Sequence, residues 1–258
     1  MIGTGQRGRN MATKTKLVAG NWKMNGLRQD GAMLAHALKE RAAEVGEAQS
    51  CEILVCPPAT LLSEVGGILV GSGIGLGGQD CHAAPKGSFT GDISAEMLAD
   101  LGCSYVVLGH SERRHGHGET DGEIRGKISG AWRAGLTAIL CVGETREQRQ
   151  AGSAVEIVSS QLDGSIPHGA TAAILVIAYE PVWAIGTGLT ATTEDIAVMH
   201  TEIRRRTPSG VRILYGGSVS PRNCDAILPL PEVDGALVGG ASLNAGDFWS
   251  IVRSLTAG

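Results

Sequence analysis

The stretch that decides the fold runs from residue 177 to residue 188 and reads Ile177-Ala178-Tyr179-Glu180-Pro181-Val182-Trp183-Ala184-Ile185-Gly186-Thr187-Gly188. An apolar run typical of a buried strand ends on the carboxylate of Glu180, and a loop with Pro181 at one end and Gly186 and Gly188 at the other follows directly. A strand end holds a side chain rigidly, whereas a loop of this composition can close as a unit. The stretch predicts that Glu180 is a catalytic base and that the loop after it closes over the site. The alternative is an ordinary turn with a solvated Glu180.

The same kind of apolar run, ending in Gly or polar residues, recurs along the chain. The eight runs are Leu17–Trp22, Ile53–Pro57, Ile74–Gln79, Tyr105–His110, Leu136–Val142, Ile174–Glu180, Val211–Gly216 and Gly235–Gly239. They lack a clean alternation of apolar and polar residues, which indicates parallel strands with both faces buried under helices.

Segments with helical periodicity lie between these runs. They are Gln29–Val45, Ala59–Val70, Ala95–Leu101, Gly122–Ala134, Ala154–Leu162, Thr193–Arg206, Asn223–Leu228 and Ala245–Leu255. A strand and helix unit repeated eight times in about 250 residues predicts a single-domain α/β fold, a closed (β/α)₈ barrel of eight parallel strands.

The boundaries of this domain follow from the N-terminal sequence. Met11 resembles a second start, so we expect residues 1–12 to form a disordered extension and residues 13–258 to form the barrel. An open doubly wound sheet is the competing fold. Its Gly-rich loop should follow the first strand, whereas a similar pattern, Gly186 to Ala191, follows the sixth and lacks an acidic residue about 20 positions later.

Composition narrows the class of partner. The 22 basic and 26 acidic side chains are well mixed and give a net charge of −4, which favours neither nucleic acid nor a membrane surface. We expect a small-molecule partner, a cytoplasmic location and six reduced cysteines, because no C-x-x-C pair occurs. A zinc site at Cys103, His115 and His117 has no ligand spacing to support it.

In such a barrel the side chains that follow the eight strands converge at one face, whatever their distance in sequence. This rule selects Lys23, Gln79, His110, Glu112, Glu180, Ser218, Gly239 and Gly240. Lys23 and His110 also have non-functional interpretations: Lys23 as a solvated surface amine and His110 as a structural histidine. We interpret Arg113 and Arg114 as an ordinary surface ion cluster.

The Gly-Gly pairs at 216–217 and 239–240 follow the seventh and eighth strands, where barrels often bind phosphate through loop amides. A base, an imidazole and a cation around an anion site suggest proton abstraction next to a carbonyl, through an enediolate. Glu180 would take the carbon-bound proton, neutral His110 would polarise the carbonyl, and Lys23 would stabilise negative charge. This chemistry requires no metal and no organic cofactor.

From Leu17 to Leu255 the chain resembles the triosephosphate isomerase family. The resemblance rests on Asn21 to Asn25, Gly91 to Ala95, Gly109 to Arg114, Cys141 to Glu144, Ala178 to Gly188, Tyr215 to Val219 and Leu237 to Ala241. It implies an aldose–ketose isomerase of glycolysis and gluconeogenesis that interconverts D-glyceraldehyde 3-phosphate and dihydroxyacetone phosphate. A Glu base, a neutral His electrophile and a closing loop on a barrel are the known features of this same family.

The resemblance also implies a role for each matching residue. Glu180 is the base, His110 the electrophile, and Asn21 and Lys23 bind substrate, with Glu112 in the supporting polar network. The phosphate would be held by the amides of Gly186, Ser218, Gly239 and Gly240, under a lid at Pro181 to Gly188.

The family is usually a homodimer, in which the loop from Cys81 to Gly91 would enter the partner and bring Thr90 to the partner's site. Gly116 departs from the family, whose members commonly carry a bulkier residue there. Two rival functions stay open at this point. A phosphate-binding aldolase would need a Schiff-base lysine inside a strand, and we predict none there; a silent binding protein would lack a catalytic residue.

Overall fold

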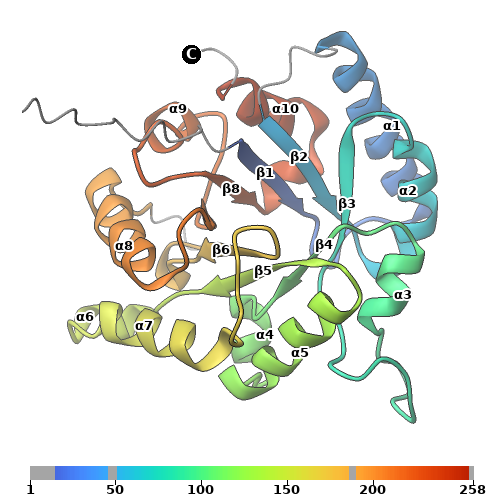
Figure 1. The fold of residues 1–258 in the computed structure, drawn as a ribbon. Coiled ribbons are helices and arrows are strands. Elements are labelled where there is room, and N and C mark those ends of the chain that lie inside the picture. Colours follow the sequence, from blue (N-terminus) through green and yellow to red (C-terminus); the bar gives the residue numbers. More distant parts are fainter. Residues whose placement is uncertain (1–14, 46–50, 186–189, 256–258) are drawn as a thin grey trace, which may run out of the picture.

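The strands of the chain close into a single parallel barrel in chain order, as Figure 1 shows. The computed structural model describes residues 15–45, 51–185 and 190–255. The strands are β1 (Lys16–Asn21), β2 (Cys51–Cys56), β3 (Ile74–Gly78), β4 (Tyr105–Leu108), β5 (Thr137–Val142), β6 (Leu175–Tyr179), β7 (Arg212–Tyr215) and β8 (Gly235–Val238). The parallel pairing of β1 with β8 completes the barrel. The predicted fold and all eight predicted strands are confirmed.

Helices surround the barrel (Figure 1). They are α1 (Arg28–Val45), α2 (Leu62–Leu69), α3 (Ala95–Asp100), α4 (Ser111–Gly116), α5 (Asp121–Arg133), α6 (Arg146–Gln150), α7 (Ala154–Ser165), α8 (Thr193–Arg206), α9 (Cys224–Ile227) and α10 (Ala245–Arg253). Short 3₁₀ turns occur at η2 (Ala59–Leu61), η3 (Val182–Ala184) and η4 (Gly240–Leu243). Each of the eight predicted helical segments overlaps one of these helices.

Two short helices, α4 and α6, were not among the predicted helical segments. Each has a capping residue that supplies a hydrogen bond to free N–H groups at the helix start. Nδ1 of His110 accepts from the backbone N–H of Glu112 at the start of α4. Thr145 and Gln148 form a reciprocal capping box at α6. A single helical turn is too short to give a periodic pattern, so only the caps signal it.

The strand residues divide between two apolar cores, because successive side chains of a strand point to opposite faces. Val18 packs outward among the helices, whereas Leu17 and Ala19 point into the barrel. The interior set is Leu17, Ala19, Leu54, Cys56, Tyr105, Val107, Ile139, Cys141, Val176, Ala178, Leu214 and Leu237. Both faces of the strands are therefore buried, as the missing alternation predicted.

A polar cluster occupies the end of the barrel where the strands begin. The hydroxyl of Tyr105 donates to Glu52 over 2.6 Å, and Arg212 bonds both Glu52 and the Tyr105 oxygen, at 2.5 and 2.7 Å. These groups satisfy one another where β2, β4 and β7 begin. With this end filled, the space for a substrate lies at the opposite end, where the strands finish.

The prediction that no lysine lies inside a strand is wrong at one position. Lys16 is the first residue of β1, and its ammonium donates to the backbone carbonyl of Leu228. Burial lowers the pKa of Lys16, against a smaller raising effect of Asp234. This amine lies where the strand starts, a barrel length from the ends of the strands, so it does not supply the Schiff-base lysine of an aldolase.

Several other features bear on the sequence predictions. The segment between β3 and α3, which contains the Cys81 to Gly91 loop, projects from the body of the barrel in Figure 1. All six cysteines are free and buried. None of the described helices is long and apolar enough to cross a membrane. The predicted extension at residues 1–12 lies outside the described residues.

Candidate active site

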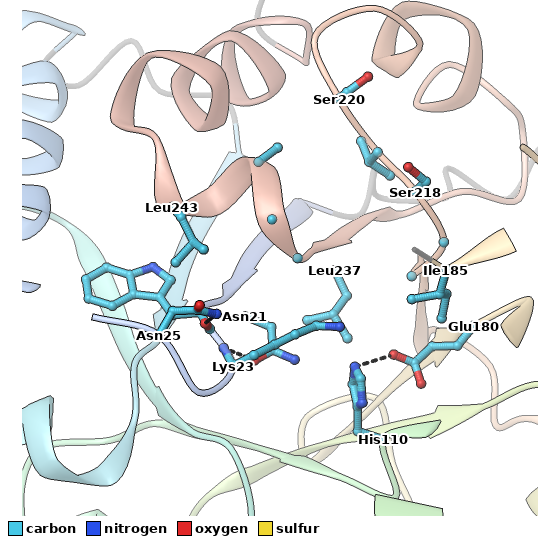
Figure 2. Close-up of a pocket in the computed structure, with 17 residues that line it drawn as sticks. Asn21, Lys23, Asn25, His110, Glu180, Ile185, Ser218, Ser220, Leu237 and Leu243 are labelled. Carbon is cyan, nitrogen blue, oxygen red and sulfur yellow. Dashed lines mark hydrogen bonds and ion pairs between the residues drawn. The ribbon is translucent and has the colours of Figure 1, made fainter. Parts of the chain in front are cut away.

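A cavity of about 470 Å³ opens at the end of the barrel where the strands finish. It is lined by seven of the predicted site residues, which come from the end of β1 and from the loops after β1, β4, β6, β7 and β8: Asn21, Lys23, His110, Glu180, Ser218, Gly239 and Gly240. Figure 2 shows Glu180, His110 and Lys23 directed toward one space, with Ser218 across it. The fold therefore brings together residues that lie up to 219 positions apart, as the positions 21 and 240 of Asn21 and Gly240 show.

Glu180 is 2% exposed and directly follows β6. Its Oε2 accepts the backbone N–H of Ser111 at 2.8 Å, and its Oε1 lies 2.9 Å from Nε2 of His110. Burial raises the pKa of Glu180, but His110 and the Ser111 amide together lower it by more, so the net pKa lies below its usual value. The carboxylate is therefore ionised at neutral pH and ready to accept a proton.

His110 is the N-terminal cap of α4. Its Nδ1 accepts the N–H of Glu112 at 3.2 Å, which leaves the ring proton on Nε2, facing Glu180. Burial lowers the pKa of His110, but the Glu180 carboxylate raises it by more, and the net pKa lies above its usual value. The predicted neutral state of His110 during the reaction stays a prediction, supported by the cap geometry.

Lys23 has a backbone φ of +54°, the one positive φ of a non-glycine residue among those described. Such a conformation is costly and persists only where surrounding contacts hold it. The Asn21 side chain accepts the N–H of Lys23 at 3.0 Å, and the Gln79 amide donates to the Lys23 carbonyl at 2.8 Å. Gln79, which the strand-end rule selected, therefore acts by fixing the Lys23 backbone.

Glu112 supports the cation of Lys23. The Lys23 ammonium lies 2.5 Å from Oε1 of Glu112, and Oε2 lies 3.6 Å from Nδ1 of His110. Glu112 does not line the cavity, and its side chain is 57% exposed. It contacts Lys23 and His110 from outside the cavity lining, and its supporting role stays a prediction.

Another part of the cavity wall consists of short backbone segments. Ser218 follows β7, and Gly239 and Gly240 follow β8, where η4 begins at Gly240. An added Cβ at Gly239 would lie 3.5 Å from Cε of Lys23, so the glycine backbone approaches the lysine closely. Backbone N–H groups without side chains, beside an ammonium, form an environment that suits a phosphate.

Besides Glu112, two predicted site residues do not appear among those that line the cavity. Thr90 is exposed on the loop between β3 and α3 and does not line the cavity of its own chain. Gly186 lies outside the described residues, as do the other residues of the predicted lid after Ile185.

The interpretation of Arg114 as a surface residue is wrong. Its side chain is 9% exposed and bonds Asp121 at 2.6 Å, and it also donates to the carbonyls of Gly109 and Cys141. Arg113 is 30% exposed and bridges Asp80 and Glu119. A pair of arginines next to each other gives no sequence signal for which one turns inward, because that depends on the partners that the fold supplies.

Sequence reasoning missed the residues that hold the base and the segment after it. Ser111 donates to Glu180, and fully buried Glu144 accepts the Trp183 indole N–H at 2.8 Å. The sequence signal for Glu144 was its position after β5, at the end of the Cys141 to Glu144 block that resembles the family. Among the described residues, no group of His, Cys, Asp or Glu is arranged to hold a metal ion, the Cys103 and His115 alternative included.

Comparison with known proteins gives consistent results. A family model for triosephosphate isomerase matches residues 16–255. The triosephosphate isomerase of Afipia carboxidovorans is 56% identical over 245 residues, which cover 92% of this chain and 96% of that protein. That of Granulibacter bethesdensis is 53% identical over 247 residues, with 93% and 98% covered.

The similarity extends to a solved structure. The crystal structure of triosephosphate isomerase from Bartonella henselae superposes with a TM-score of 0.83 at 45% identity, and covers 93% of this chain and 98% of that one. The family match includes every strand of the barrel and every residue that lines the cavity. The chain therefore belongs to the triosephosphate isomerase family.

Proposed function

We propose that the chain interconverts D-glyceraldehyde 3-phosphate and dihydroxyacetone phosphate, as an intramolecular aldose–ketose isomerase of glycolysis and gluconeogenesis (EC 5.3.1.1). The observation that carries this proposal is the convergence of the Glu180 carboxylate, the His110 imidazole and the Lys23 ammonium on one cavity with a glycine-rich wall. A base, a hydrogen-bond donor and a cation are the groups that carbon-proton transfer next to a carbonyl needs. Membership of the family supports it.

Glu180 removes the carbon-bound proton in this mechanism. Its pKa below the usual value keeps it ionised, and its position at the end of β6 fixes the distance to the substrate carbon. To act, the carboxylate must exchange its contacts with Ser111 and His110 for the substrate. The ligand-free contacts therefore hold the base in a resting position.

His110 donates from Nε2 to the substrate oxygens and moves a proton between them. The Glu112 N–H on Nδ1 fixes the tautomer that carries the proton on Nε2. Since the enediolate bears its charge on oxygen, a donor and the nearby Lys23 ammonium stabilise it where it forms.

The substrate phosphate would lie against the backbone of Ser218, Gly239 and Gly240, which line the same cavity as Glu180. Asn21 and Lys23 line the same cavity and complete the substrate-binding set. Gly186 stays a predicted phosphate donor, and the lid over Pro181 to Gly188 stays a prediction, because the structure describes it only as far as Ile185. No metal or organic cofactor enters this mechanism.

The assembly proposed is a homodimer formed through the Cys81 to Gly91 loop, with Thr90 next to the partner's site. The loop projects from the barrel, and Phe89 within it is 45% exposed. Exposed apolar residues on a projecting loop favour burial against a second copy. We further propose that residues 13–258 form the one catalytic domain, and that the enzyme works in the cytoplasm, where its six free cysteines stay reduced.

A coupled assay on purified protein, with glyceraldehyde 3-phosphate as substrate and no added metal, tests the function. Turnover that survives a chelator is expected. Absence of turnover would contradict the isomerase assignment, and turnover abolished by the chelator would contradict the cofactor-free mechanism. An aldolase would instead release or join two carbon fragments, which the same reaction mixture reveals by product analysis.

A further inference from the structure

The backbone of Glu180 lies against Gly143, the residue that follows β5. A Cβ added at Gly143 would lie 1.7 Å from the carbonyl oxygen of Glu180 and 3.2 Å from its Cα. These distances are far below van der Waals contact, so only glycine allows the two backbones to approach this closely. The hydrogen bonds from Glu180 N–H to Val142 O at 2.8 Å and from Val182 N–H to Glu144 O at 3.1 Å bracket the contact.

The side-chain amide of Gln161 holds Gly143 on its other side. The Gln161 Oε1 accepts the Gly143 N–H at 2.7 Å, and Nε2 donates to the Gly143 carbonyl at 3.1 Å. Gln161 thereby satisfies both backbone groups of one residue, as a neighbouring strand would. Two bonds from one planar amide fix the orientation of the Gly143 peptide as well as its position.

These contacts form a continuous path from a helix to the proposed base. Gln161 belongs to α7, Gly143 follows β5, and Glu180 follows β6. A displacement of Gly143 would carry the Glu180 backbone with it, because interiors are close-packed and the two chains touch. We propose that Gln161 is a positioning residue for isomerisation, which sets the place of the Glu180 carboxylate through Gly143. This inference rests on the proposed function.

The attachment of α7 does not depend on Gln161. Val158 and Leu162 of this helix are buried in the core outside the barrel, at 2% and 1% exposure. Gln161 itself is half-buried. Removing its amide should therefore leave the helix in place and release the Gly143 peptide, so that a kinetic effect can be separated from unfolding.

Two substitutions at this position form a graded test. Gln161→Leu removes both hydrogen bonds, whereas Gln161→Glu keeps an oxygen for the Gly143 N–H and loses the donor to the carbonyl. Gln150→Leu makes the same chemical change at an exposed position of α6 and serves as the control. Steady-state kinetics are compared with circular dichroism and thermal unfolding of the same samples.

We expect Gln161→Leu to lower kcat by about 10- to 100-fold with KM unchanged, since a displacement of about 1 Å of a reacting group has an effect of this size. Gln161→Glu should recover part of the loss, and Gln150→Leu should match the wild type. A kcat per folded molecule equal to the wild type in Gln161→Leu, or a change in KM with kcat unchanged, would overturn the inference. Should Gln161→Leu not fold, the kcat of Gln161→Glu decides on the same criterion.

Amide hydrogen exchange tests the same contact without activity. Gln161→Leu should accelerate exchange of the Glu180 N–H, which donates to Val142. If wild-type protein does not isomerise the substrate, the proposed function fails and this exchange still tests the contact. If the wild type is active and both the exchange and kcat are unchanged in the variant, only the role of Gln161 is wrong.

Discussion

Oε1 of Glu180 lies 2.9 Å from Nε2 of His110, so the proposed base and the proposed electrophile are each other's partners in the ligand-free site. Both groups are nearly inaccessible to solvent, at 2% and 5% exposure. A substrate that enters between them replaces this one contact by two, one from Glu180 to the substrate carbon and one from His110 to the substrate oxygen. The pair therefore keeps both side chains oriented and satisfied until the substrate arrives.

Shortening the base should remove activity without loss of the fold. In Glu180→Asp the carboxylate retracts by about 1 Å, and we expect kcat to fall on the order of 100-fold because the proton-transfer distance changes. Circular dichroism should match the wild type, since Asp retains the charge. Measurement of kcat by the coupled assay decides, and an unchanged rate would exclude Glu180 as the base.

The pKa of His110 should respond to removal of its partner. In the ligand-free wild type we expect it above about 6.5, the ordinary value for histidine, because Glu180 outweighs burial. In Glu180→Gln burial dominates, and the pKa should fall below that of the wild type. Titration of the imidazole ¹⁵N signals by NMR measures both values. A pKa that does not fall would show that the carboxylate does not set it.

The pKa shifts of His110 and Glu180 determine how these two residues contribute to the free energy of unfolding as pH changes. The raised pKa of His110 contributes stability that is complete below its unfolded pKa and is lost as pH rises through its folded pKa. The lowered pKa of Glu180 contributes stability above its unfolded pKa, lost as pH falls through its folded pKa. Both contributions coincide between about pH 4.3 and about pH 6.5, the ordinary values for Glu and His. Chemical denaturation across this range measures the effect, and a free energy of unfolding that does not decline on either side would contradict it.

Trp183 should matter for the segment that follows the base. Its indole donates to fully buried Glu144 at 2.8 Å, and the Arg149 guanidinium lies 4.6 Å from the ring centroid. Trp183→Phe keeps an aromatic ring but removes the donor, and we expect a loss of about 1–3 kcal/mol in unfolding free energy, the cost of a buried acceptor that loses a hydrogen bond to a charged group. Chemical denaturation measures it. An unchanged midpoint would show that Glu144 finds another donor.

The oligomeric state tests the role of the β3–α3 loop. Thr90→Arg places a charge at an exposed position of the Cys81 to Gly91 loop, where we propose that it meets the partner. A charge buried without a partner is costly, so the variant should dissociate at concentrations at which the wild type is dimeric. Sedimentation velocity over a dilution series, with activity measured on the same samples, decides. A stable wild-type monomer with full activity would contradict the proposal.

Much of the fold is determined locally by the sequence. The apolar runs before Glu180 and His110 are long enough to indicate buried parallel strands, and the repeat of strand and helix leads to a closed barrel. Because all strands of such a barrel end on one face, the same repeat predicts that Lys23, His110 and Glu180 lie together. This expectation depends only on chain order and not on side-chain packing.

Tertiary structure decided what the sequence pattern left open. Two adjacent arginines look alike in the sequence, yet Arg114 turns inward to Asp121 and backbone carbonyls while Arg113 stays half-exposed. The contact of Gly143 with Glu180, and the Gln161 amide behind it, join three elements that no local pattern relates. Periodicity reports which face of an element is buried. The hydrogen-bond partner found by a buried polar group depends on which other elements the closed barrel brings within about 3 Å.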